Sequence, residues 1–589
     1  MGVDATKDGT LGSDFGRQQL RAMANIPVSE KSALRITGNW DHVVGVSKDA
    51  YNIQDRLNKN VDFRGRYLYK GSEDFSINLI SSYAIRASKG VQMFTPGPET
   101  INPFTGLPEN PLLGPFALAH GVHLSWDNQY TIASMPQHQR TKRYGSSAEV
   151  DWKMAGHNFV SITGWEKNIM YPGAGVMLGL DAPPLAGTES GSWGGSTRYG
   201  RNMTQEFRIS SPTGHNLDYV GGLFYGNEKH WEDWAPSYPP PPPQYNFDDT
   251  TTTVTQLNYA AFGDVNYAFT DAFKAFAGLR EQKFVVKMIQ DDLTVGMSYP
   301  KKTSTTALSY RLGGQYNINK DVMLYTSASS ATKRPVIEFN FSNPAAPPKL
   351  LKTEVVTSFE LGTKAATSDK KTAIDINLFY TKDKNYQTQT CFADPTNPFG
   401  GVTCTTENVD HFLSKGVEVN LSSRPIAGLT IDAGYILTIA KYPNGFLATD
   451  TVINPALPFP LNMVTVIKDL GGEQMINTPR HKITFNGEYG KPVTEKLYGF
   501  FSIDAVYKSE RRLLNSPWPE CIYPSFWMFG SNIGIRDIED KWSVTLFGRN
   551  LNDKHEPYSI WTDHQNGAIF IMYNEQAYRQ VGISVNVSF

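Results

Sequence analysis

The sequence predicts an all-β fold, a large antiparallel transmembrane β-barrel of about 22 strands with short periplasmic turns and long extracellular loops. Three observations lead to this prediction. Apolar and polar residues alternate in segments spread over the whole chain. Short connections alternate with long ones, and the last segment of the chain, which ends at Phe589, has the same apolar–polar alternation.

The alternating segments have the two-residue period of strands whose faces meet different environments. In chain order they are FSINLISSY (75–83), AEVDWKM (148–154), AFGDVNYAF (261–269), GVEVNLS (416–422), LTIDAGYILTI (429–439), HKITFNGEY (481–489) and LYGFFSIDAVYK (497–508). Most extend over roughly nine to twelve residues, the length that a tilted strand needs to cross a bilayer, whereas strands of soluble sandwiches are about half as long.

The connections are of two kinds. Short ones at 317–321, 367–371 and 423–429 are typical of tight turns. Long ones, rich in Pro, Gly and aromatic residues, cover about 90–142, 168–200, 228–254, 331–352, 385–412, 441–478 and 509–524. This one-sided pattern is typical of outer-membrane barrels, and no fixed repeat indicates a propeller or a string of sandwiches.

The final segment VGISVNVSF predicts the strand that closes the barrel. Successive residues of a strand point to opposite faces. The apolar set should face lipid (Val581, Ile583, Val585, Val587 and Phe589), and the polar set should face the lumen (Ser584, Asn586 and Ser588). Because a sheet in lipid must have no free edge, we expect this strand to pair with a first strand within residues 2–24.

One closed architecture is favoured over several domains. At roughly 27 residues for each strand with its connection, 589 residues give about 22 strands. A lumen of that width is too large for its own side chains to fill.

Composition narrows the function. The mean hydropathy is −0.37 and no apolar run is long enough for a transmembrane helix, although a barrel would escape that criterion. A net charge of −2 argues against a nucleic-acid partner. The 11 histidines form no metal-ligand motif; His120 and His123 could share a metal or haem contact, but exposed loop histidines are favoured. No cofactor is expected. Since no nucleophile elbow, P-loop or supported carboxylate pair occurs, we predict that the protein is not an enzyme.

Two loops carry candidate site residues. In the segment 226–249, Trp231, Trp234, Tyr238 and Tyr245 accompany acidic residues and five consecutive prolines, so they could stack on a ligand; the alternative is an interfacial aromatic girdle. Cys391 and Cys404 flank a turn-rich segment and predict a disulfide, with two free thiols as the alternative. Cys521 has no evident partner.

Several segments, taken together and in order, resemble one family, the TonB-dependent outer-membrane receptors of Gram-negative bacteria. They are RAMANIPVSEKSALRITG (21–38), GRNMTQEFRISSP (200–212), YVGGLFYGNE (219–228), NYAAFGDVNYAFTDAFKAFAGLREQ (258–282), TSFELGTKAA with IDINLFYTKDKNYQTQ (357–389), SKGVEVNLSSRPIAGLTIDAGY (414–435), NTPRHKITFNGEY (477–489), FGRNLNDKHEPY (547–558) and the last twelve residues (578–589).

The resemblance implies a monomeric barrel over 1–589 in the Gram-negative outer membrane, in contact with outer-membrane lipid, which takes up a bulky, scarce extracellular solute, by default a ferric siderophore. It also implies a TonB complex as energy source, and a barrel-assembly machinery that recognises Phe589. The signal peptide, TonB box and N-terminal plug domain of the family are not visible in this sequence, so it resembles a barrel that begins downstream of them. A passive porin-like channel and a secreted glycan-binding β-protein remain as alternative functions.

Overall fold

The computed structural model describes most of the chain. The described residues are 2–8, 16–44, 48–50, 57–90, 94–131, 137–171, 176–177, 191–192, 194–212, 214–236, 250–293, 296–338, 349–393, 402–457, 463–563, 568–573 and 577–588.

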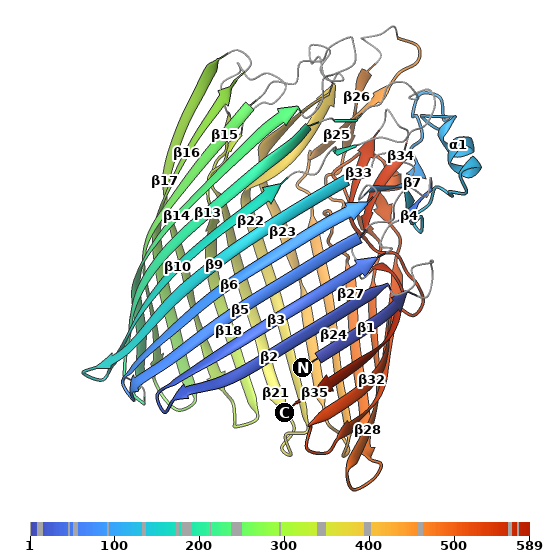
Figure 1. Ribbon diagram of the computed structural model, residues 1–589. Coiled ribbons are helices and arrows are strands. Elements are labelled where there is room, and N and C mark those ends of the chain that lie inside the picture. Colours follow the sequence, from blue (N-terminus) through green and yellow to red (C-terminus); the bar gives the residue numbers. More distant parts are fainter. Residues whose placement is uncertain are drawn as a thin grey trace.

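Within the described residues, an antiparallel sheet of 22 strands closes on itself as a barrel (Figure 1). Its strands are β1 (Gly2–Asp8), β2 (Arg17–Ser29), β3 (Ser32–Val44), β5 (Leu57–Ser72), β6 (Phe75–Gly90), β9 (Gln137–Met154), β10 (His157–Tyr171), β13 (Gly194–Ser210), β14 (Leu217–Pro236), β15 (Thr250–Ala268), β16 (Phe273–Asp292), β17 (Met297–Asn317), β18 (Val322–Lys333), β21 (Glu354–Ala366), β22 (Thr372–Ala393), β23 (Val402–Ser423), β24 (Leu429–Lys441), β27 (His481–Pro492), β28 (Leu497–Lys508), β31 (Phe526–Asp537), β32 (Trp542–Arg549) and β35 (Gln580–Val587).

Smaller elements lie between these strands. They are β4 (Lys48–Asp49), β7 (Phe94–Glu99), α1 (Leu113–Ala119), β8 (Tyr130–Thr131), β11 (Val176–Met177), β12 (Gly191–Ser192), β19 (Ile337–Glu338), β20 (Lys349–Leu350), β25 (Leu447–Ile453), β26 (Met463–Asp469), β29 (Arg511–Arg512), the 3-10 turn η1 (Pro519–Cys521), β30 (Ile522–Tyr523), β33 (Pro557–Asp563) and β34 (Ala568–Tyr573). No helix among the described residues is long and apolar enough to cross a membrane.

The barrel closes between the first and last strands, as the sequence predicted. β35 pairs with β1 in antiparallel register from Gly2↔Asn586 to Asp8↔Gln580, and its other edge pairs with β32. Figure 1 places the two ends of the chain close together. Each backbone edge of the sheet therefore has a partner, which is the condition for a sheet to lie in lipid.

The two ends of the barrel differ, as predicted. At one end, here the short-turn end, neighbouring strands are joined by a few residues; Ala155 and Gly156, for example, link β9 to β10 with φ values of 52° and 78°. The opposite end, the long-loop end, carries α1 and the small sheets (Figure 1). Several strands are longer than the expected segments, up to 22 residues in β22 and β23, and their extra length lies toward the long-loop end.

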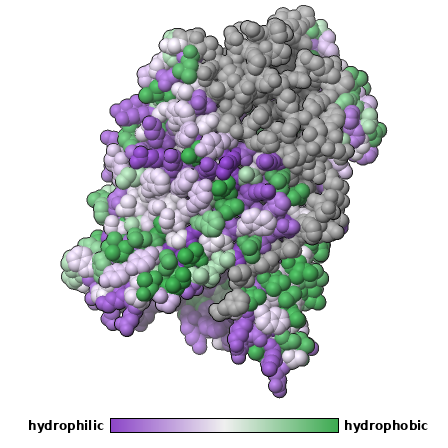
Figure 2. Space-filling model, viewed as in Figure 1, coloured by the Kyte–Doolittle hydropathy of each residue, from purple (hydrophilic) through white to green (hydrophobic). Residues whose placement is uncertain are grey.

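Side chains alternate between the two faces of the wall. Val581, Ile583 and Val585 of β35 are exposed on the outer face, while Asn586 and Ser588 line a hollow inside the barrel. In Figure 2 the hydrophobic residues gather over the lower part of the visible wall, with hydrophilic residues above and below them. The outer face thus carries an apolar band, as a bilayer requires.

Candidate functional site

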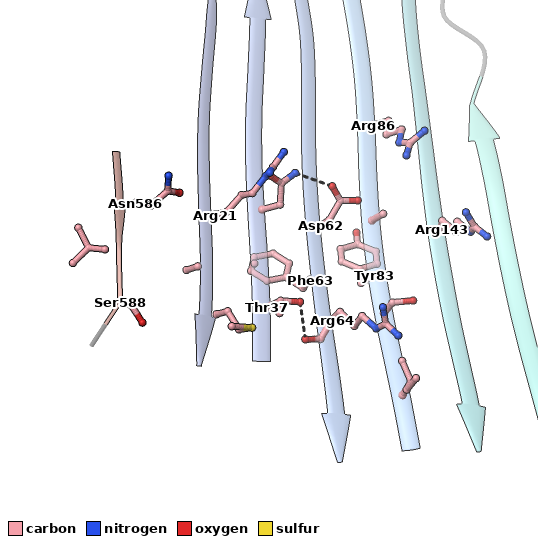
Figure 3. A pocket seen from close by; sticks show the side chains of 18 of the residues that line it. Arg21, Thr37, Asp62, Phe63, Arg64, Tyr83, Arg86, Arg143, Asn586 and Ser588 are labelled. Atoms are coloured by element: carbon pink, nitrogen blue, oxygen red, sulfur yellow. Dashed lines mark hydrogen bonds between the residues drawn. The ribbon is translucent and has the colours of Figure 1, made fainter. Parts of the chain in front are cut away.

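Arginines from four strands line the inner wall near the short-turn end. This arginine arc consists of Arg21 (β2), Arg64 (β5), Arg86 (β6) and Arg143 (β9), and it borders a hollow of about 1430 Å³ (Figure 3). The register of the sheet brings them to one face, since Arg64 lies opposite Ser82 and Arg143 lies opposite Ala84. Arg143 pairs with Glu166 at 2.5 Å, and Asp62 lies between Arg21 and Arg86 in the figure.

Carboxylates line the opposite part of the inner wall. Six consecutive strands, β21 to β28 of the main sheet, each direct at least one inward. The carboxylate arc, as defined here, takes one from each strand: Glu360, Asp375, Glu418, Asp432, Glu488 and Asp504. Asp375 and Asp432 border a second hollow of about 360 Å³, and Glu488 reaches the first. Lys364 is a nearby cation, 4.0 Å from Asp375.

The two arcs face each other across the lumen. Seven strands separate β9 from β21 in one direction, and four separate β28 from β2 in the other. Figure 1 shows the blue strands β2 to β6 on the near wall and the yellow strands β21 and β22 behind them. The lumen is therefore positive on one side and negative on the other, and any molecule inside it would experience a directed field.

Between the arcs, one ion pair of the inner wall neutralises both of its charges. Arg311 (β17) donates through Nε and Nη2 to the two carboxylate oxygens of Asp264 (β15), both at 2.6 Å. The pair spans the strand between them because Gly278 (β16), opposite both residues, has no side chain to collide with Asp264. Such a bidentate pair fixes the geometry of the two side chains, so neither charge is free to contact a solute in the lumen.

At the long-loop end, segments far apart in the sequence form a packed layer, called here the loop platform (94–131, 509–526 and 555–563 with 568–573). β7, β33 and β34 form a three-stranded sheet, and α1 packs Leu113 and Ala117 against Ala568 and Phe570. Tyr523, fully buried, donates from its hydroxyl to the carbonyl of His555 at 2.6 Å. The platform therefore has a hydrophobic core of its own.

Three cationic side chains in or next to the platform are paired with carboxylates. Lys508 and Arg511 both contact Glu556, at 2.7 and 2.6 Å, and the guanidinium of Arg511 lies over the ring of Tyr523. Arg512, whose side chain is 4% exposed, pairs with Glu473 at 2.8 Å. Burial alone would raise the pKa of Glu473, but the contacts with Arg512 and Lys468 outweigh it and lower that pKa.

A carboxylate from the β25–β26 hairpin ties that hairpin to the platform. Asp450 accepts hydrogen bonds from the Ser516 hydroxyl, the Trp518 indole and the Thr562 hydroxyl at 3.0, 2.9 and 3.2 Å. Three donors on one carboxylate make a charge-assisted cluster. The hairpin and the platform are thus joined by polar contacts as well as by apolar packing.

The predicted aromatic site is only partly described. Trp231 lies on the outward parity of β14 with Leu223 and Tyr225, and its ring is 5.1 Å from that of Tyr199. Trp234 lies in β14 with its side chain outside the described part of the chain, and Tyr238 and Tyr245 are outside it altogether. Ligand contact by these residues stays a prediction.

Cys391 and Cys404 are directly opposite each other in the β22–β23 pair. Opposite residues of an antiparallel pair have Cα atoms close enough for a disulfide, but the two side chains lie outside the described residues and the bond stays a prediction. Cys521 is buried with a free thiol. Phe589 is also outside the described part.

No group of three or more His, Cys, Asp or Glu side chains suited to a metal occurs among the described residues. His120 packs on the ring of Phe116 and bonds its carbonyl through Nδ1 at 2.9 Å, whereas His123 is exposed.

Comparison with known proteins adds to this geometry. The family model "TonB dependent receptor-like, beta-barrel" matches residues 8–551. The chain belongs to the TonB-dependent receptor family. No curated protein matches the sequence.

Solved structures share the fold at low sequence identity. The ferric yersiniabactin uptake receptor of Yersinia pestis is 14% identical with a TM-score of 0.72, and the match covers 100% of this chain and 79% of that one. The pyoverdine outer membrane receptor of Pseudomonas aeruginosa, bound to pyoverdine, is 14% identical with a TM-score of 0.72, covering 100% and 78%. The ferric-catecholate import receptor of E. coli is 14% identical with a TM-score of 0.70, covering 100% and 81%.

Membership places the barrel in the Gram-negative outer membrane, as a non-enzymatic transport protein. In this family the short turns face the periplasm and the long loops face the exterior. The loop platform is then external, and the arginine arc lies near the periplasmic exit.

The sequence did not single out the two charged arcs or the platform. The sequence contains part of the signal for the carboxylate arc, because Glu418 and Asp432 belong to the polar set of the alternating segments 416–422 and 429–439. Their meeting on one wall depends on strand order and register, which those local patterns do not contain.

Proposed function

We propose that this receptor takes up a bulky, scarce extracellular solute, by default a ferric siderophore, with energy from a TonB complex. The observation that carries the proposal is the ordered loop platform above a wide, polar-walled lumen. A packed external surface can hold a solute at the mouth, and a lumen of this width can pass it.

The charge of the inner wall supports an anionic solute. Many ferric complexes of catecholates and carboxylates carry net negative charge, and the arginine arc would hold such an anion on its way out of the barrel. The carboxylate arc would repel it from the opposite wall. The solved structures named above are receptors for ferric siderophores, but at 14% identity they support the fold and not a specificity.

The family implies further partners, which belong to the same proposal. A plug domain in the lumen would meet both arcs, so we expect an acidic face toward β2–β9 and a basic face toward β21–β28. The barrel would be monomeric and would be inserted by the barrel-assembly machinery through Phe589.

Binding and energised uptake test the proposal separately. The detergent-purified chain is titrated with a panel of ferric siderophores and the iron-free compounds while tryptophan fluorescence is followed; saturable quenching by one ferric complex is expected. Cells carrying the natural gene are then compared with and without TonB for uptake of the labelled complex, and only the former should accumulate it.

Two outcomes would contradict uptake of this kind. A large, steady conductance of the purified chain in planar bilayers, with TonB-independent solute entry, would favour a passive porin-like channel. Binding of oligosaccharides but of no ferric complex would favour a glycan-binding function for the external loops.

A further inference from the structure

One stretch of the outer face carries cations in a line. Lys167 (β10) lies opposite Arg201 (β13), which lies opposite Lys229 (β14). Beyond Thr255 (β15) the same line continues to Lys287 (β16), which lies opposite Lys302 (β17). These five cations, called here the basic row, follow one line of cross-strand neighbours.

The basic row faces outward. Lys167 points to the same face of its strand as Trp165, and Arg201 to the same face as Met203. Trp165 and Met203 lie in the apolar band, with 38% and 41% of their surface exposed. All five cationic side chains are exposed. Trp165 is two positions from Lys167 and Met203 is two positions from Arg201, so the basic row begins at the edge of the apolar band. A line of cross-strand neighbours runs perpendicular to the strands, and the strands are tilted, so the row lies progressively nearer the exterior from β10 to β17.

The protein does not neutralise these charges within its described part. None of the five forms an ion pair with a carboxylate there, in contrast to Arg143, Arg198 and Arg311 on the inner face. Glu228 is next to Lys229 in the chain but lies on the opposite face, where it binds His230 and Arg334.

Outward-facing acids lie too far along the strands to help. Asp233 and Asp291 are each four positions from a cation of the row, roughly 13 Å along an extended strand. Three pairs of like charge are therefore directly opposite one another, and such pairs destabilise a sheet. A ligand with several negative charges would remove that cost.

We propose that the basic row binds the phosphate groups of a phosphorylated glycolipid of the outer leaflet. The row meets the apolar band where acyl chains end and headgroups begin, which suits a lipid better than a soluble anion. It spans five strand spacings, roughly 24 Å, enough for several phosphates of one or two headgroups.

The test uses the full chain in detergent, with lipid A bearing two phosphates as the probe and the same lipid without phosphates as its control. Wild-type protein binds the phosphorylated form more tightly, and the difference shrinks as salt rises. Equal binding of both forms by the wild type overturns the proposal without any variant.

A charge-neutralised variant locates the site. K229Q/K287Q/K302Q should bind phosphorylated lipid A roughly 100-fold more weakly. The matched control, K382Q/K384Q/K415Q, removes three exposed, outward lysines that are not in the row, and it should bind as the wild type does. Heat-modifiable gel migration verifies that both variants are folded.

Two further results would overturn the proposal. One is an equal loss of lipid A binding in both triple variants. The other is equally tight binding of a soluble polyphosphate without acyl chains, which would make the row a site for soluble polyanions.

Discussion

At the scale of single residues, the external loops contain groups whose chemistry is set by burial. Cys521 is fully buried beside Trp518 and Tyr523, and burial raises the pKa of its thiol to about 12. The reactive thiolate is therefore almost absent at ordinary pH, and the residue behaves as a small apolar side chain of the platform.

Thiol counting gives the first prediction. The native protein at pH 8 should react with no equivalent of maleimide, because Cys521 is buried and Cys391 and Cys404 are predicted to be bonded. Unfolding without a reductant should expose one thiol, and unfolding with a reductant should expose all three cysteines of the chain. Mass spectrometry of labelled peptides identifies the sites; labelling of Cys391 or Cys404 before reduction would show that the disulfide prediction is wrong.

The pairing of Glu473 with Arg512 gives a pH dependence. The pKa of Glu473 is lower in the folded state than its ordinary value of 4.5. Its stabilising contribution is thus complete above pH 4.5 and is lost as the pH falls through the lowered pKa. Arg512 also donates to the carbonyls of Ser516 and Trp518, so protonation of Glu473 should loosen the segment 511–521.

Hydrogen exchange of the peptide 511–521, corrected for intrinsic rates, measures this effect. Its protection should be constant from pH 7 to 5 and should fall below pH 4. Glu473→Gln should show the lower protection already at pH 7, and Glu495→Gln, in an exposed short turn, should not. An acid response that persists unchanged in Glu473→Gln would assign it to another group.

At the scale of elements, the short turns set the register of the hairpins. Gly428, in the short turn before β24, has φ +81°, and a Cβ at this position would lie 2.0 Å from the carbonyl oxygen of Gly490, so any other residue would collide there. Gly445, in the external connection after β24, has φ +75° but open space around it. The two glycines share a backbone requirement and differ in steric room.

That difference predicts unequal effects of the same substitution. Gly445→Ala should cost about 1 kcal/mol, the penalty of a left-handed alanine. Gly428→Ala should cost about 1–3 kcal/mol more, because the turn must shift away from Gly490. Urea unfolding in lipid vesicles, followed by heat-modifiable migration, compares the two midpoints; equal midpoints would mean that the turn relaxes without cost.

At the scale of the whole molecule, the sequence predicted the barrel, its closure and the sidedness of its connections. These follow from local patterns: the parity of residues 581–587 determined both the lipid-facing residues and the need for a first strand, and β1 is that strand. Strand lengths were underestimated because the outward alternation weakens above the bilayer, where β14 and β22 continue as polar strands.

Features that depend on distant residues were not predictable in the same way. Gln129 and His555 are 426 positions apart in the sequence, but the amide nitrogen of Gln129 lies 2.6 Å from the ring Nε2 of His555 within the loop platform. The arcs and the basic row also arise from register between strands. A hydrophobic pattern assigns each residue to a face, but only strand order and shear decide which charges become neighbours.

Closure itself can be tested by a cross-link. Ala5 of β1 lies directly opposite Ile583 of β35, so in a background with the three native cysteines replaced by serine, A5C/I583C should form a disulfide on oxidation. The bond joins the two ends of the chain into a ring. Oxidised, denatured protein should therefore migrate differently from the reduced form on a gel, and the folded barrel should unfold more slowly.

The register provides the control. In A5C/V581C the second cysteine replaces Val581, which lies on β35 two positions before Ile583 and points to the same face. Val581 lies opposite Lys7 and not opposite Ala5. Its cross-linking should be slow and incomplete, since cysteines whose Cα atoms are more than about 7 Å apart cannot bond without moving the backbone. If the two variants cross-linked equally well, the end strands would slide past one another, and the lateral edge of the barrel would be open to exchange.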